Sequence, residues 1–70
     1  MKELKIHTEY ITLNQAVKLC GEADSGVDAK IMILNGEVKV NHEIEMRRGK
    51  KLRENDVFEV KNHEYVVHAD

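Results

Sequence analysis

The hydrophobic pattern of this 70-residue chain changes its period at Gly36. Before Gly36, apolar side chains recur at helical spacing, and four of them fall at i, i+3, i+4 and i+7: Leu13, Ala16, Val17 and Cys20. After Gly36, short runs such as Val38-Lys39-Val40 alternate apolar and polar residues, which is typical of strands. The change predicts an α+β domain in which two short N-terminal helices pack on a small, mostly antiparallel sheet. A chain this short has room for one small core, so we expect residues 1–70 to form a single domain.

Both predicted helices begin at a capping residue and end at a glycine. Thr12 is the expected N-cap of the first helix, and Gln15 at position N3 completes a capping box. Ser25 is the expected N-cap of the second helix. Gly21 and Gly36 end the two helices, because glycine adopts a positive φ at little cost. The helices should therefore form a compact helix-turn-helix unit.

The inner face of the second helix is predicted from its apolar spacing. Val27, Ile31 and Leu34 fall at i, i+4 and i+7, so we expect them to face the core. Lys30 borders this stripe.

One strand is expected before the helices and four after them. The first is short and covers residues 4–6. Of the four later strands, the first covers residues 38–40 and the second follows the turn at Asn41-His42. The last two cover residues 57–60 and 65–67. Leu52 should reach the core between the second and the third of these strands. Asn55-Asp56 and residues 61–64 are expected turns.

The register of the hairpin at Asn41-His42 is predicted from the faces of its strands. A strict two-residue loop would pair Val40 with Glu43 and so mix apolar and polar side chains on one face. A slip of one residue moves every side chain to the other face. We therefore expect a three-residue or bulged loop, which pairs Val40 with Ile44 and Val38 with Met46.

Charge is distributed unevenly along the chain. There are 11 Lys and Arg residues against 13 Asp and Glu, for a net charge of -2. Residues 47–53, called here the basic stretch, contain no acid and five of the 11 positive charges: Arg47, Arg48, Lys50, Lys51 and Arg53. These like charges repel one another, and this repulsion does not stabilise the fold. We therefore interpret the basic stretch as a site for phosphates or for an acidic partner. A solvated loop is the alternative without a function.

Two segments carry a resemblance to a known family. Residues 35–41 read NGEVKVN and residues 52–57 read LRENDV, and both follow the capped helix pair. In this order they resemble the RNA-binding domain named after the small-subunit ribosomal protein S-four. Residues 25–30 and 47–51 look more like its small stand-alone bacterial subgroup, the YaaA/YbcJ-like proteins. The resemblance covers residues 10–60, and it implies the S-four-like (alpha-L) fold.

The resemblance also implies a function. Members of the family bind structured RNA, such as ribosomal or transfer RNA, through the helix pair and the adjoining hairpin. This chain departs from the family at the start of the first helix, where Ile11 to Asn14 includes no basic residue. It also has His42 and Asn55 where the family has turn glycines, and both residue types tolerate left-handed φ.

The start of the second helix is a candidate phosphate site. Ser25 and Gly26 lie at its N-terminus, where free N–H groups and the helix dipole suit an anion. An ordinary helix cap is the alternative.

Two isolated lysines are further candidates. Lys30 is expected to face the ligand, because buried lysines are rare, or else to pair with Glu37 or Asp28. Lys39 should lie near the basic stretch through the hairpin, and a cross-strand pair with Glu45 is its alternative.

The aromatic residues are few, and none lies within the basic stretch. Proteins that bind single strands stack bases on aromatic side chains, whereas helical RNA is recognised by its shape, phosphates and 2′-hydroxyls. The three aromatic residues are Tyr10, Phe58 and Tyr65, with Phe58 expected in the core. This composition favours duplex or folded RNA as the partner.

Other classes of function find little support in the sequence. We expect no membrane segment and no signal peptide. The single Cys20 cannot form an internal disulfide, and we expect an inert buried thiol in a cytoplasmic protein. The histidines lack metal-ligand spacing, and we find no catalytic triad, carboxylate pair or nucleotide loop.

The sequence therefore predicts a bacterial, non-enzymatic protein without cofactor, metal or small-molecule substrate. Its expected partner is structured RNA, in ribosome assembly or translation. A module that docks an acidic protein through the basic stretch is the alternative.

Overall fold

A five-stranded sheet and a two-stranded ribbon surround the core of the computed structural model, which describes residues 1–70. The elements are β1 (Lys2–Ile6), β2 (Ile11–Thr12), α1 (Leu13–Leu19), α2 (Gly26–Leu34), β3 (Val38–Val40), β4 (Glu43–Ile44), β5 (Lys51–Leu52), β6 (Val57–Val60) and β7 (His63–Ala69). The sheet has the order β1-β7-β6-β3-β4, in which only β1 and β7 are parallel. The predicted α+β class with a mostly antiparallel sheet is confirmed.

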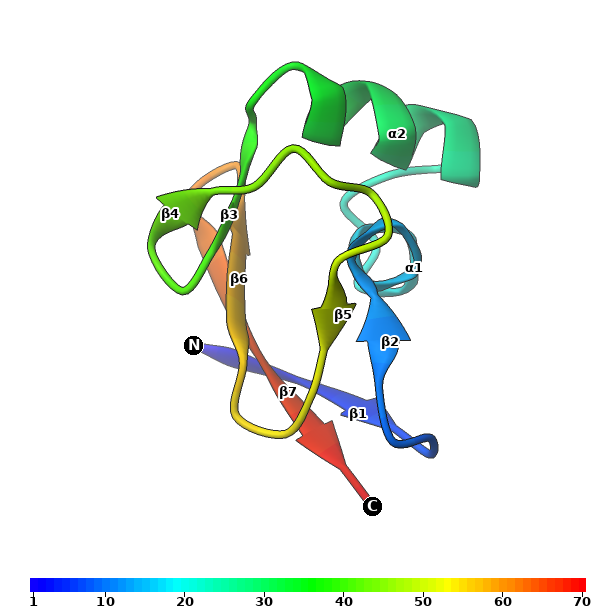
Figure 1. Ribbon diagram of the computed structural model, residues 1–70, viewed down its shortest axis with the longest axis vertical. Helices are drawn as coiled ribbons and strands as arrows, with labels where there is room; N and C mark the ends of the chain where they lie inside the picture. Colours follow the sequence, from blue (N-terminus) through cyan, green and yellow to red (C-terminus); the bar gives the residue numbers. More distant parts are fainter.

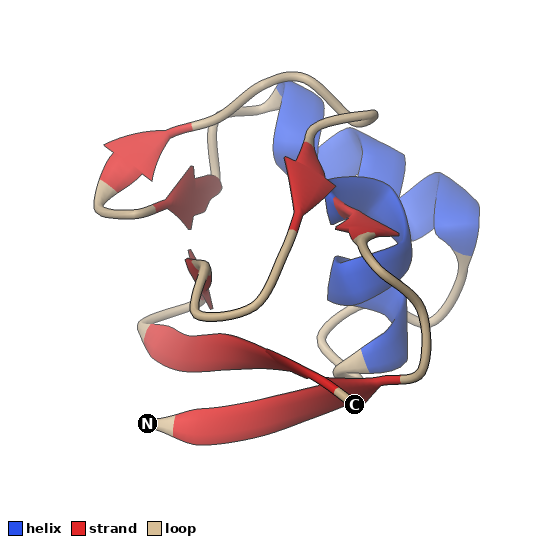
Figure 2. Cartoon of the chain, turned by 60° about the horizontal axis from the view of Figure 1, so that its bottom comes forward, coloured by secondary structure: helices blue, strands red, loops and turns tan.

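The helices gather on one side of the molecule, and the ribbon of β2 and β5 lies beside α1 (Figures 1 and 2). Seventeen buried residues form one hydrophobic cluster, with no polar or charged residue among them. Phe58 is fully buried and stacks on Tyr65, with ring centroids 5.1 Å apart. Leu52 is also fully buried, as predicted.

The predicted helix boundaries are confirmed at both helices. The Thr12 hydroxyl accepts from the Gln15 N–H at 3.3 Å, and the Gln15 amide accepts from the Thr12 N–H at 3.4 Å. The Ser25 hydroxyl accepts from the Asp28 N–H at 3.2 Å and caps α2. Beyond α1, Gly21 adopts a φ of 90°, in the region that glycine reaches most easily.

The predicted inner face of α2 is wrong. Val27, Ile31 and Leu34 are exposed, whereas the buried residues of this helix are Ala29, Met32 and Ile33. Five of the nine residues are large or branched apolar side chains and two faces are apolar, so spacing alone could not choose between them. Ala29 of α2 and Ala16 of α1 are both fully buried, and the two helices pack on each other.

The predicted register of the hairpin is also wrong. The structure has the two-residue loop, which pairs Lys39 with Ile44 and Val40 with Glu43. Asn41 and His42 both adopt positive φ, as this tight type of hairpin loop requires. The prediction assumed that β4 buries one face, but β4 is an edge strand whose two residues are both exposed. The side chains of β4 therefore did not have to match the buried face of β3.

A second two-residue turn lengthens the last strand. Lys61 and Asn62 both have positive φ, so β7 begins at His63 rather than at the predicted Tyr65. The turn predicted at Asn55 is confirmed by its φ of 72°.

Hydrogen bonds join the two segments that carry the family resemblance. The Asn41 amide donates to the Asp56 carboxylate at 3.3 Å and accepts from the Val57 N–H at 3.0 Å. The other Asp56 carboxylate oxygen accepts from the Arg53 N–H at 2.8 Å. These bonds hold Arg53 beside the end of β3.

Candidate nucleic-acid interface

The backbone of the basic stretch is attached to the start of α1. The Leu13 N–H donates to the Lys50 carbonyl at 2.8 Å, and the Asn14 N–H donates to the Arg48 carbonyl at 3.0 Å. These N–H groups have no partner within the helix, so the loop satisfies donors that would otherwise need water or a ligand. The basic stretch is therefore a fixed part of the fold.

The start of α2 is tied to the same place through one side chain. The Asn14 amide donates to the Gly26 carbonyl at 3.3 Å. Asn14 thus contacts the basic stretch through its backbone and the start of α2 through its side chain. Two predicted regions that are 20 residues apart in the sequence, Ser25-Gly26 and the basic stretch, are brought together in this way.

One of the five cations in the basic stretch is paired within the protein. Arg47 donates to both carboxylate oxygens of Glu45, from Nε at 2.9 Å and from a terminal nitrogen at 3.0 Å. The Glu45 side chain is only 15% exposed, and the hydrogen bond from Arg47 lowers the pKa of its carboxyl to about 2. The other four cations have no acidic side chain within 4.0 Å: Arg48, Lys50, Lys51 and Arg53.

The two isolated lysines are exposed and unpaired. Lys30 makes no ion pair with Asp28 or Glu37. Lys39 lies between Ile44 and Glu59 in the sheet, and its expected partner Glu45 is taken by Arg47.

Tyr10 is a residue that the sequence reasoning missed. Lys51 Nζ lies 4.8 Å and Arg53 Cζ 5.4 Å from the centre of its ring. The basic stretch therefore does have an aromatic neighbour, supplied by the segment that leads into β2. The sequence feature that could have indicated Tyr10 is the triplet Tyr10-Ile11-Thr12. Its side chains alternate between the two faces of a strand, with Ile11 facing inward.

A second group of titratable side chains connects Glu22 with His63 and Tyr65. The Glu22 carboxylate accepts from the Tyr65 hydroxyl and lies 2.7 Å from His63 Nδ1, and both contacts lower its pKa. Burial raises the pKa of Tyr65 and of the half-buried Cys20 thiol. The bonds of Glu22 attach the loop after α1 to the start of β7.

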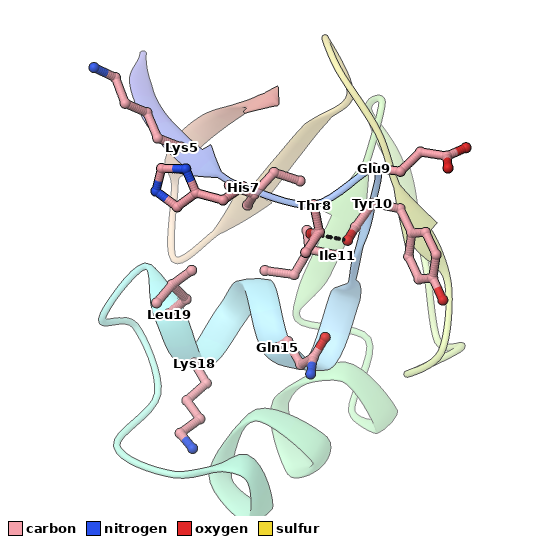
Figure 3. Close-up of a pocket in the computed structure, with 10 residues that line it drawn as sticks. Lys5, His7, Thr8, Glu9, Tyr10, Ile11, Gln15, Lys18 and Leu19 are labelled. Carbon is pink, nitrogen blue, oxygen red and sulfur yellow. Dashed lines mark hydrogen bonds between the residues drawn. The ribbon is translucent and has the colours of Figure 1, made fainter. Parts of the chain in front are cut away.

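An open groove of about 850 Å³ lies between the end of β1 and α1. Figure 3 shows Lys5 and His7 on one side of it and Lys18 and Leu19 on the other. No group of three or more His, Cys, Asp or Glu side chains is placed to hold a metal ion. None of the helices has the length and apolar character needed to cross a membrane.

Comparison with known proteins assigns the fold. A family model described as "S4 domain" matches residues 4–68. The chain belongs to the S4 domain family. This is the family that the segments at residues 35–41 and 52–57 indicated.

Two relatives extend the comparison. The chain is 46% identical over 57 residues to the "probable ribosome maturation protein RlbA" of Bacillus subtilis (strain 168), covering 81% of this chain and 80% of that one. It is also similar to YbcJ from E. coli, with a TM-score of 0.74 and 30% identity over 99% of this chain and 89% of that one. The solution structure of YbcJ is described as revealing an ALFAL motif involved in RNA binding. The predicted S-four-like fold and the YbcJ-like subgroup are both confirmed.

Proposed function

We propose that this protein binds structured RNA, ribosomal or transfer RNA, and acts in ribosome assembly. The observation that carries the proposal is the set of four unpaired cations at residues 48–53, held on the start of α1 by backbone hydrogen bonds. Because this loop is already ordered, little conformational entropy is lost when its side chains meet phosphates. The S4 domain family and the two relatives support the same reading.

The proposed surface has two rims that meet at Asn14. The basic stretch forms one rim, and its unpaired side chains contact phosphates. The start of α2 forms the other, where the N–H groups of Gly26 and Val27 suit an anion and Ser25 caps the helix. Lys30 extends this rim along α2, and Lys39 extends the surface across the sheet.

Arg47 has a double role in this proposal. Two of its N–H groups bind Glu45, which leaves the rest of the guanidinium for a phosphate. Its side chain is 74% exposed, so it remains accessible.

We further propose that residues 1–70 work as one RNA-binding domain in the cytoplasm, where ribosomes are assembled, by binding and without catalysis. The relative described as a ribosome maturation protein matches most of its own length to this chain, which supports the ribosomal role. No cofactor, metal or small-molecule substrate is part of the proposal.

The test is binding of fluorescent RNA by anisotropy across a salt series. A ribosomal RNA hairpin, a single strand and duplex DNA of equal length are the probes. If five phosphates are neutralised, log K against log salt should have a slope of roughly -3.5 to -4.5. Wild-type protein that binds no RNA at about 50 mM salt, where electrostatic contacts are strongest, would overturn the proposal.

A matched pair of variants locates the site. Arg53→Ala should weaken binding and reduce the magnitude of the slope by about 0.7 to 0.9, because one phosphate contact is lost. Lys2→Ala removes the same charge from β1, on the sheet edge opposite β4, and should leave both quantities unchanged. Equal effects of the two substitutions would place the RNA elsewhere. Binding of an acidic peptide but of no RNA would favour a protein partner instead.

A further inference from the structure

The outer face of the β2–β5 ribbon combines one aromatic ring with two cations. Ile11 pairs with Leu52, and both point into the core. Side chains alternate along a strand, so the neighbours of Ile11 and Leu52 point outward. Thr12 pairs with Lys51 on this outer face. Continuing the register places Tyr10 opposite Arg53, in agreement with the short distances from the Tyr10 ring to the Arg53 and Lys51 side chains.

The position of Tyr10 is set by the backbone before β2. The Thr8 hydroxyl donates to the Tyr10 carbonyl at 2.7 Å, the bond drawn in Figure 3. Tyr10 borders the groove, but in that view its ring points away from Lys18 and Leu19. The ring is directed instead toward the side chains of β5.

Apart from their contacts with one another, the Tyr10 hydroxyl and the two cations have no hydrogen-bond or ion-pair partner among the side chains of the protein. Tyr10 is 39% exposed, and its hydroxyl makes no hydrogen bond to the protein. Lys51 and Arg53 make no ion pair, although the chain carries 13 acids. An exposed ring bordered by two unpaired cations matches the chemistry of a nucleotide, which offers a flat base and a phosphate on either side.

We propose that Tyr10 stacks on an unpaired base of the bound RNA, while Lys51 and Arg53 bind the phosphates that flank this nucleotide. The inference rests on the proposed RNA-binding function and adds a preference to it. The RNA presents an unpaired nucleotide, such as a bulge or loop base, next to its helical part. The helical part contacts the remainder of the basic stretch.

Magnitudes favour the base over the existing cation contacts. An exposed cation–π contact is worth about 2- to 5-fold in an equilibrium constant. Stacking of one base on an aromatic side chain is worth about 5- to 150-fold. A base that displaces Lys51 from the ring therefore gains more than it disrupts, and the displaced ammonium is free to bind a phosphate.

Neither helical RNA nor an acidic peptide would stack on the Tyr10 ring. An A-form helix keeps its bases stacked inside and offers phosphates and 2′-hydroxyls. A carboxylate would bind the two cations but gains nothing from the face of Tyr10, because that face carries negative charge density.

The experiment compares wild type, Tyr10→Phe and Tyr10→Ala on matched RNAs. One hairpin has a single-nucleotide bulge, the second has an abasic residue at the bulge, and the third is fully paired. We expect Tyr10→Ala to lose about 5- to 150-fold in affinity for the bulged RNA and less than about 2-fold for the other two. Tyr10→Phe keeps the ring, so it should stay within about 2-fold of wild type on all three RNAs.

A second readout reports stacking directly. The fluorescence of 2-aminopurine at the bulge should be quenched on binding to wild type and to Tyr10→Phe, but not on binding to Tyr10→Ala. The control is Ile44→Ala, which also shortens an exposed side chain and should behave as wild type. Equal losses on all three RNAs, or no loss with Tyr10→Ala, would overturn the inference while wild-type binding leaves the proposed function standing. If wild type binds no RNA at about 50 mM salt, the proposed function itself fails. An acidic peptide whose binding is weakened equally by Tyr10→Ala would also overturn the inference, in favour of a protein partner.

Discussion

Arg47 is expected to contribute to stability, whereas its neighbour Arg48 is not. Arg47→Ala removes both hydrogen bonds to Glu45, whose carboxylate is only 15% exposed. Pairs between exposed side chains contribute about 0.2–1 kcal/mol, and a two-pronged contact to a mostly covered carboxylate belongs near the upper end. We therefore expect Arg47→Ala to lower the free energy of unfolding by about 1 kcal/mol at pH 7.

This loss should depend on pH in a defined direction. Arg47 holds the pKa of Glu45 at about 2 in the folded protein, below its ordinary value of 4.5. A carboxyl whose pKa is lowered by folding stabilises the protein above its unfolded pKa, and that contribution is lost as the pH falls through the folded pKa. The difference between wild type and Arg47→Ala should therefore be full above pH 5 and close to zero at pH 2.

Urea unfolding followed by circular dichroism at pH 7, 5, 3 and 2 measures this difference. With a slope near 1 kcal/mol per molar urea for so small a domain, the midpoint at pH 7 should fall by about 1 M. Arg48→Ala is the control and should stay within about 0.5 kcal/mol of wild type at each pH, because Arg48 has no acidic partner. An Arg47→Ala deficit that is absent at pH 7, or that persists unchanged at pH 2, would refute the reasoning.

Two further substitutions test the fold. His42→Gly should raise the free energy of unfolding by up to about 1 kcal/mol, because His42 has a φ of 73° and Asn-Gly suits a two-residue hairpin best; a lower melting temperature would contradict this. Phe58→Ala should cost about 3–5 kcal/mol in thermal or urea unfolding, because the ring is fully buried against Tyr65. Its control is Ile44→Ala at an exposed position, and a loss below about 1 kcal/mol for Phe58→Ala would mean that the core repacks.

Features that depend on neighbours within a few residues were predictable from the sequence. The capping box of Thr12 and Gln15 and the cap at Ser25 involve atoms three residues apart, so the residue types alone specify them. The turn at Asn41-His42 was recognisable for the same reason, since Asn tolerates the positive φ. The basic stretch was visible as a run of like charges.

Features that depend on long-range packing were not predictable. Packing in the tertiary structure selected the inner face of α2, which buries Ala29, Met32 and Ile33, because both faces of α2 are apolar. The geometry of the two-residue loop set the register of the hairpin. The edge strand β4 has no buried side chain, so burial did not favour another register.

The sequence by itself determined where the helices begin and end, and that positive charge gathers at residues 47–53. Only the tertiary structure decided what that charge can do. It gave Arg47 a partner in Glu45, left Lys51 and Arg53 unpaired, and placed Tyr10 beside them from a segment about 40 residues away. The physical reason is that capping and charge clustering are local, whereas ion pairing and stacking depend on which strands meet.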